Sequence, residues 1–178
     1  IETSIVQIKK IIKNLRTFTR DGDKESFVEV QVKVLVEEIL EFFRSRFKEA
    51  GVELHFEEIP DSLTLECHET EILQILLNLV SNAFDAVQIY AEKWVRIQVL
   101  DRDDQVEITV VDSGKGIPPA IREKIMMPFF TTKGTGAGPG LGLSICKSIA
   151  EAHGGTLTLD PLFPNTRFVL LLPKSRIN

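Results

Sequence analysis

The sequence is poor in several features that define whole classes of protein. Its only two cysteines, Cys67 and Cys146, have no metal-binding spacing, which argues against a disulfide framework and favours a reducing, cytoplasmic compartment. No apolar run reaches the ~18 residues that a membrane-spanning helix needs. Lys and Arg number 21 against 26 Asp and Glu, a net charge of −5, which argues against nucleic acid as the main partner.

The remaining composition is that of a globular domain. Hydrophobic residues make up 43% and charged residues 26% of the 178 residues, enough for one ordinary domain with a short appendage. The chain begins with Ile1 rather than Met, so we expect a piece of a longer protein. The sequence leaves open whether that parent protein is anchored at the inner membrane.

Hydrophobic periodicity predicts both helices and strands. Helices are expected over 1–20, 34–50, 69–91, 118–125 and 141–153. Strands are expected over 27–32, 52–57, 62–66, 94–100, 106–111, 156–159 and 167–172. This mixture favours an α+β fold, a two-layer α/β sandwich with one mixed sheet and helices on one face, plus an N-terminal helix. We assign residues 1–22 to that helix, as half of a hairpin or a dimer seam, and residues 27–174 to the domain.

A polar row interrupts the apolar helix expected over 69–91. Asn78, Asn82 and Asp85 follow one another at i, i+4 and i+7 and therefore share one face. Carboxamide oxygens suit a hard, hydrated cation such as Mg²⁺. Taken alone, the row is equally consistent with side chains that face solvent or cap a neighbouring loop.

Three further segments have binding chemistry. The first runs from the hydrophobic strand into Asp112-Ser113-Gly114-Lys115-Gly116, where an acid precedes two glycines, although Asp-Ser-Gly also forms ordinary turns. The second, 127–133, has two aromatic residues followed by hydroxyls and Lys133, a charge suited to phosphate or simply to solvent. The third, 134–144, is a glycine-rich loop that opens a helix, which is typical of phosphate binding and also of flexible linkers.

Together and in this order, the four segments resemble the catalytic and ATP-binding domain of sensor histidine kinases, within the gyrase/histidine-kinase type of ATPase. Residues 78–85 match the N box of that family, 112–116 its G1 box, 128–133 its F box and 138–142 its G2 box. The resemblance covers about 27–173 and implies a Bergerat-type fold that holds ATP between the long helix and the glycine loop. The helix over 1–20 resembles the second helix of the family's dimerisation hairpin.

The resemblance also implies site residues. Asn82 would coordinate Mg²⁺, Asn78 would lie near the phosphates, Asp112 would bind the adenine amino group and Lys133 would approach the outer phosphates. Asn78, Asn82 and Lys133 are thus the catalytic candidates. The nucleotide would contact Asn78, Asn82, Asp85, Asp112, Gly114, Gly116, Ile117, Phe130, Thr131, Thr132, Lys133, Gly138, Gly140, Leu141, Gly142 and Leu143.

Two residues depart from the pattern of relatives. ATP-hydrolysing relatives have a glutamate where this chain has Asn78, and an asparagine cannot act as a general base, which favours holding ATP for transfer. Pro139 replaces the usual threonine or serine between G2 glycines and removes a hydroxyl and an N–H group.

None of the three histidines fits the family's phosphoacceptor. We expect His68 near a helix start, His153 at a helix end and His55 on the polar face of a strand. The resemblance therefore implies an acceptor histidine upstream of this chain, relay to a response regulator, and a homodimer formed through the hairpin. Two alternatives are a serine/threonine kinase of the anti-sigma type and a degenerate, non-catalytic nucleotide-binding module.

Overall fold

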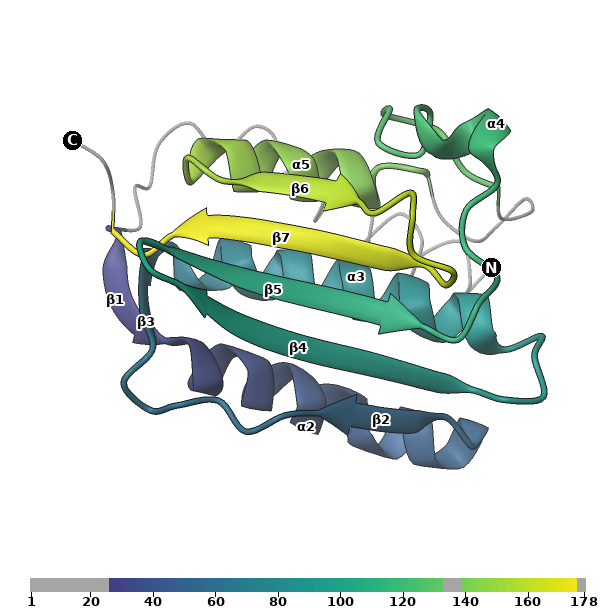
Figure 1. Cartoon of the computed structure of the whole chain (residues 1–178), viewed down its shortest axis with the longest axis horizontal. Coiled ribbons are helices and arrows are strands. Elements are labelled where there is room, and N and C mark those ends of the chain that lie inside the picture. The colour runs from purple at the N-terminus through teal and green to yellow at the C-terminus, as the bar shows by residue number, and fades with distance from the viewer. Residues whose placement is uncertain (1–25, 133–138, 176–178) are drawn as a thin grey trace, which may run out of the picture.

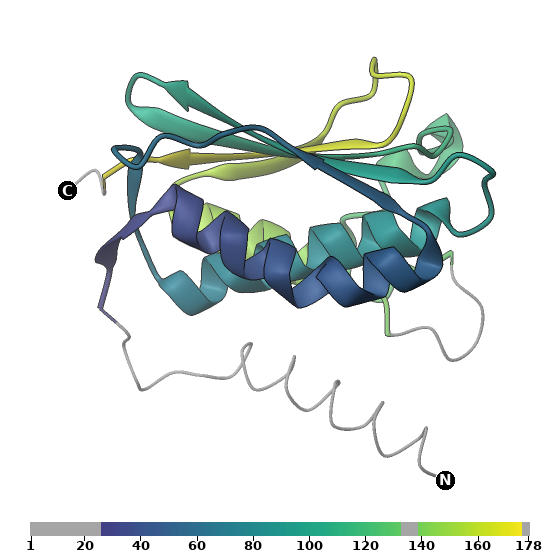
Figure 2. The same cartoon turned by 90° about the horizontal axis from the view of Figure 1, so that it is seen from below.

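The computed structural model describes residues 26–132 and 139–175 as a two-layer α/β sandwich, which confirms the predicted fold class. A five-stranded sheet forms one layer and helices cover one of its faces (Figures 1 and 2). The helix predicted over 1–22, together with Lys133 and Gly138, lies outside the described residues. No helix in the described part of the chain is long and apolar enough to cross a membrane.

The main sheet is mixed, as predicted. Its strands are β2 (Glu53–Phe56), β4 (Trp94–Arg102), β5 (Gln105–Asp112), β7 (Arg167–Pro173) and β6 (Thr156–Leu159), in that spatial order. Strand β2 pairs with β4 in parallel, and the other pairs are antiparallel. The short turn at 103–104 allows β4 and β5 to form a long hairpin, which places Asp112 at the end of a central strand.

Two predicted strands do not join this sheet. β1 (Val28–Gln31) and β3 (Thr64–Cys67) form a separate two-stranded antiparallel sheet, which corrects the expectation of a single sheet. Backbone hydrogen bonds connect this pair to its surroundings, from Val32 N–H to Leu63 O and from Glu66 N–H to Lys174 O. The small sheet thus lies where the chain enters the sandwich.

The helical layer consists of α2 (Val32–Ala50), α3 (Glu69–Val87) and α5 (Gly142–Ala152), with a short α4 (Pro119–Arg122) at one end (Figure 1). Gly51 caps the C-terminal end of α2, and its φ of 64° is the left-handed conformation that glycine adopts without strain. α3 ends at Val87, earlier than predicted, and Gln88 donates its side-chain amide to Phe84 O there. α4 is also shorter than predicted.

The core lies between the two layers. Eight buried apolar side chains of α3 form much of it: Ile72, Ile75, Leu76, Leu79, Val80, Ala83, Phe84 and Val87. On α2, the side chain of Phe42 is 69% exposed. Phe43, about 100° further around the helix, fills the core instead. Burial therefore fixes α3 and leaves its polar row at the edge of the core.

Candidate functional site

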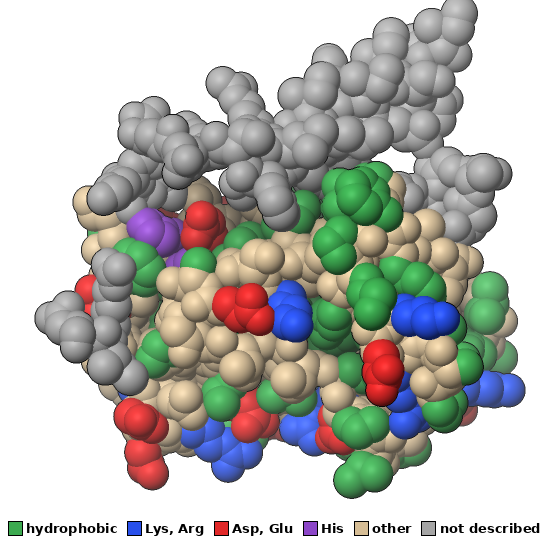
Figure 3. Space-filling view, turned by 90° about the horizontal axis from the view of Figure 1, so that it is seen from above, with side chains coloured by type: hydrophobic (Ala, Val, Ile, Leu, Met, Phe, Trp, Pro, Cys, Tyr) green, Lys and Arg blue, Asp and Glu red, His purple; other side chains and the backbone are tan. Residues whose placement is uncertain are grey.

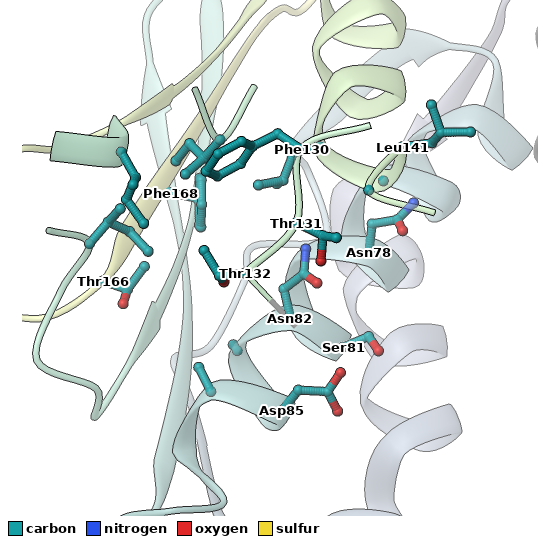
Figure 4. A pocket seen from close by; sticks show the side chains of 18 of the residues that line it. Asn78, Ser81, Asn82, Asp85, Phe130, Thr131, Thr132, Leu141, Thr166 and Phe168 are labelled. Carbon is teal, nitrogen blue, oxygen red and sulfur yellow. The ribbon is translucent and has the colours of Figure 1, made fainter. Parts of the chain in front are cut away.

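A pocket of about 240 Å³ opens where α3, the start of α5 and the ends of β5 and β7 meet. In Figure 4, Asn78, Asn82 and Asp85 lie on one side of it and Thr166 and Phe168 on the other. The pocket is lined by Asn78, Ser81, Asn82, Ala83, Asp85, Ala86, Asp112, Ile117, Ile121, Ile125, Phe130, Thr131, Thr132, Pro139, Gly140, Leu141, Gly142, Leu143, Thr166 and Phe168. It combines an apolar interior with a few convergent polar groups, as small-molecule sites do.

The polar row of α3 forms one wall of the pocket. Asn78 donates its side-chain N–H to Gln74 O at 3.0 Å, one turn earlier in the same helix. That bond turns Nδ2 back onto the helix and fixes the orientation of the amide. Asn82 and Asp85 continue the row along the pocket wall. Helical periodicity therefore brings together the three residues that the sequence predicted to share a face.

The start of α5 approaches this row closely. A Cβ atom on Gly142 would lie 2.9 Å from Asn78 Oδ1, so only glycine allows this approach without moving the amide. Gly140 has a φ of 70°, and a Cβ there would lie 2.6 Å from Phe130 O. The two glycines thus let the chain pass tightly between the residues of the F box and α3.

Asp112 lies at the other end of the pocket and is only 3% exposed. Burial raises the pKa of its carboxyl to about 6. Hydrogen bonds from the Gly114 backbone and the Thr166 side chain lower the pKa and offset part of this effect. Gly114 N–H donates to Asp112 Oδ1 at 2.8 Å. Near neutral pH this is a buried carboxylate that lines a pocket, a combination typical of binding sites.

The turn after Asp112 is held by the loop that precedes β7. Asn165 donates its side-chain N–H to Gly114 O at 2.9 Å, and Asp112 N–H donates to Thr166 O at 3.1 Å. A Cβ on Gly114 would lie 2.6 Å from Asp112 Oδ1 and would displace the carboxylate. Gly114 therefore supports Asp112, and neither Gly114 nor Gly116 is among the residues that line the pocket.

The segment 129–132, which precedes the glycine loop, forms another wall of the pocket. Phe130, Thr131 and Thr132 line it, while Phe129 is 75% exposed and adopts a φ of 65°. A positive φ is uncommon for a bulky residue and marks a sharply turned backbone. Phe129 and Phe130 thus separate, one toward solvent and one into the pocket.

The structure brings most of the predicted site residues to one pocket. Lining it are Asn78, Asn82, Asp85, Asp112, Ile117, Phe130, Thr131, Thr132, Gly140, Leu141, Gly142 and Leu143. Sequence reasoning missed Ser81, Thr166 and Phe168, and the supporting contact from Asn165. Ser81 lies beside Asn82, one position from the predicted row. The other three become visible only once β7 pairs with β5.

The histidines lie away from this pocket. His68 is the N-cap of α3 and His153 the C-cap of α5, as expected, and His68 N–H donates to His153 Nε2 at 3.1 Å. Burial lowers the pKa of His153, which favours the neutral ring that this bond requires. On β2, His55 Nε2 lies 3.2 Å from Glu53 Oε2. The buried ring of His153 and the half-buried His68 therefore have structural contacts.

The charged side chains described around the site do not form a set of metal ligands. Among the described residues, no group of three or more His, Cys, Asp or Glu side chains is placed to hold a metal ion. On the face in Figure 3, acidic and basic side chains are interspersed. A cation at this pocket would thus depend on amide oxygens and on oxygens that its ligand supplies.

Comparison with known proteins decides the family. The model of the histidine kinase-, DNA gyrase B- and HSP90-like ATPases matches residues 67–176, more than half of the chain. The chain belongs to this ATPase family. The ATPase domain is 35% identical to the catalytic domain of histidine kinase ThkA, with a TM-score of 0.76, over 84% of this chain and 96% of that one.

Two curated sensor proteins match over most of the ATPase domain. Sensor protein FixL of Bradyrhizobium diazoefficiens is 36% identical over 83% of this chain, and the C4-dicarboxylate transport sensor protein DctB of Pseudomonas aeruginosa is 37% identical over 86%. The chain spans 29% of the first and 25% of the second. ThkA in complex with the response regulator TrrA also aligns with 98% of this chain, at 28% identity and a TM-score of 0.79.

Proposed function

We propose that this chain is the ATP-binding domain of a two-component sensor histidine kinase, which donates the γ-phosphoryl group of ATP to a histidine for relay to a response-regulator aspartate. One observation carries the proposal. A single pocket has the buried Asp112 at one end and the row of Asn78 and Asn82 at the other, with Gly140 and Gly142 between. An acceptor for a base and amides for phosphate or metal thus meet in one cavity.

Each end of the pocket has a role in this proposal. Ionised Asp112 accepts a hydrogen bond from the exocyclic amine of adenine, and Thr166 and Asn165 keep its carboxylate and turn in place. Apolar side chains such as Ile117 and Phe168 exclude water from the base. At the phosphate end, Thr131, Thr132 and Lys133 would face the phosphates, and Gly138 and Gly140 would allow the loop to close over them. ATP supplies the phosphoryl group when bound.

Mg²⁺ fits the residues present. Magnesium keeps several waters and takes one or two protein oxygens together with phosphate oxygens, so a site without a carboxylate cage is adequate. In our proposal Asn82 supplies the protein oxygen, and Asn78 orients the phosphates beside it. Gly142 leaves the space that Asn78 Oδ1 requires.

The same pocket is poorly equipped to hydrolyse ATP. Asp85 and Asp112 are the carboxylates among its described lining residues, and neither is placed as a base for attacking water: Asp112 is hydrogen-bonded at the buried end, and Asp85 is paired with Arg46. Because Asn78 cannot accept a proton, positioning and charge neutralisation are the available means of catalysis. A pocket that acts only by positioning and charge neutralisation favours transfer of the phosphoryl group over hydrolysis of ATP.

The acceptor histidine would lie outside this chain. The ring of His153 accepts a hydrogen bond from His68 N–H, and His55 sits on an edge strand at the far side of the sheet from β6. The matched relatives are sensor kinases, which does not favour the anti-sigma type of serine/threonine kinase. In our proposal residues 1–22 belong to the hairpin through which the parent dimerises, and a receiver domain is the next partner.

Label transfer tests the proposal. The chain is incubated with Mg²⁺ and γ-labelled ATP, together with a helical hairpin that contains the acceptor histidine of its own parent protein. We expect label on the hairpin that is lost in acid, as for a phosphohistidine, and retained in base. Acid-stable label on serine or threonine would support the anti-sigma type of kinase. Nucleotide binding without any transfer would support a non-catalytic module.

A further inference from the structure

The outer end of the α3 row has a charge that the proposed ligand should not tolerate. Asp85 lines the same pocket as Asn78 and Asn82. A triphosphate has several negative charges, so an isolated carboxylate in the wall beside it would repel it. The position therefore needs a compensating charge, either from a metal ion or from the protein.

The compensating charge comes from the neighbouring helix. Arg46, near the end of α2, places Nη2 3.3 Å from Asp85 Oδ1. In Figure 4, the Asp85 carboxylate points away from Thr166 and Phe168. The ion pair thus links α2 to α3 at the rim of the pocket.

A second contact keeps the Arg46 guanidinium in place. Its Cζ lies 4.2 Å from the centroid of the Phe84 ring, within the range of a cation–π interaction. Phe84 is buried and its ring packs 5.0 Å from that of Phe47, so the surface on which Arg46 rests is rigid. An exposed ion pair alone contributes little, but here the Phe84 ring also restrains the guanidinium of Arg46.

We propose that Arg46 is a positioning residue for the nucleotide: it draws the Asp85 carboxylate toward α2 and cancels its charge, so that the end of the α3 row accepts a triphosphate. The inference rests on the proposed function. It assigns to α2 a part in ATP binding, although Arg46 itself is not among the lining residues of the pocket.

A series of charge variants tests the inference. Arg46→Gln, Asp85→Asn and the double variant are compared with the unaltered chain in calorimetric titrations with ATP and Mg²⁺, and with adenosine. Arg44→Gln is the matched control, because Arg44 pairs with Glu41 on the exposed side of the same helix. Adenosine lacks phosphates and reports whether the pocket itself is intact.

We expect the ATP affinity of the variants to follow the local charge at the end of the α3 row. Arg46→Gln weakens ATP binding about fivefold, because the positive charge beside Asp85 is lost, and the effect shrinks at high salt. Asp85→Asn tightens ATP binding about twofold, because Arg46 keeps its charge, and the double variant returns close to the unaltered chain. Adenosine affinity and the Arg44→Gln control do not change.

Several outcomes would overturn the inference. Weaker ATP binding by Asp85→Asn would mean that Asp85 contacts the metal or nucleotide directly. Equal loss of ATP and adenosine in Arg46→Gln would reduce Arg46 to a packing role. If the unaltered chain binds ATP and no variant differs from it, only this inference fails. If the unaltered chain binds no ATP, the proposed function fails with it.

Discussion

At the scale of single residues, Asp112 has two opposing effects. The pocket needs its charge to accept a hydrogen bond, whereas burial penalises that charge and raises the pKa of the carboxyl to about 6. The folded state therefore binds a proton more tightly than the unfolded chain, whose ordinary value is 3.8. The raised pKa therefore stabilises the folded state fully below pH 3.8, and this stabilisation is lost as the pH rises through about 6.

Replacement of Asp112 by Asn should separate the two effects. Asn keeps an oxygen for Gly114 N–H without a buried charge, so we expect the free energy of unfolding at pH 8 to rise by about 1–2 kcal/mol. We expect ATP binding to weaken about tenfold, because a charge-assisted hydrogen bond is lost. Denaturant unfolding and calorimetry measure the two quantities.

The exposed turn residue Asp104 offers the control for this change. Asp104→Asn removes the same charge from the surface and should alter neither quantity. In the unaltered chain, ATP affinity should fall as the pH drops below about 6, where Asp112 takes up its proton. An Asp112→Asn variant that is less stable at pH 8, or binds ATP unchanged, would contradict the assignment.

At the scale of elements, α3 contacts both ends of α5. His68 N–H bonds to His153 Nε2 where α3 starts and α5 ends, and Asn78 faces Gly142 where α5 starts. The two helices therefore run antiparallel, and the start of α5 is fixed against the polar row. This contact makes the geometry of the row depend on one glycine.

Gly142→Ala tests that dependence. Its Cβ would lie 2.9 Å from Asn78 Oδ1 and push the amide aside, so we expect Mg²⁺-ATP binding to weaken about tenfold. Stability should change little, because alanine favours the helix that it crowds. Gly154→Ala, at a φ of 72° beyond the helix end, is the opposite case: it should cost about 1 kcal/mol of stability and leave ATP affinity intact. Loss of ATP affinity in Gly154→Ala but not in Gly142→Ala would contradict the proposed role of Gly142.

Pro139 gives a second test at the start of this element. It lines the pocket but has no N–H group to offer a phosphate. Pro139→Thr restores an N–H and a hydroxyl, and we expect calorimetry to show ATP binding about threefold to tenfold tighter. Unchanged or weaker binding would mean that this position makes no polar contact with the nucleotide.

Local pattern predicted much of the site, and pairing between distant strands supplied the rest. The row of Asn78, Asn82 and Asp85 follows from helical periodicity, and Asp112 from a strand that ends in an acid. Thr166 and Asn165 could not be predicted, because nothing in their neighbourhood shows that β7 pairs with β5. The sequence pattern of α2 also does not decide which of Phe42 and Phe43 is buried, because two adjacent phenylalanines fit one amphipathic stripe equally well.

At the scale of the whole molecule, one end of the sandwich is built for binding. The sheet presents Asp112 and Thr166 there, and the helical layer presents its amides to the same cavity. The core that holds both layers together is continuous, from α2 through α3 to β5 and β7. A ligand that touches both layers should therefore stabilise the whole domain against unfolding.

Calorimetric titration of the chain with ATP, with and without Mg²⁺, while phosphate release is followed, tests the central claim most directly. We predict micromolar affinity that Mg²⁺ tightens, a loss of that tightening in Asn82→Ala, and negligible release of phosphate. Absence of binding would contradict the nucleotide site. Equal tightening by Mg²⁺ in Asn82→Ala would contradict its metal assignment, and rapid phosphate release would contradict a pocket that holds ATP for transfer.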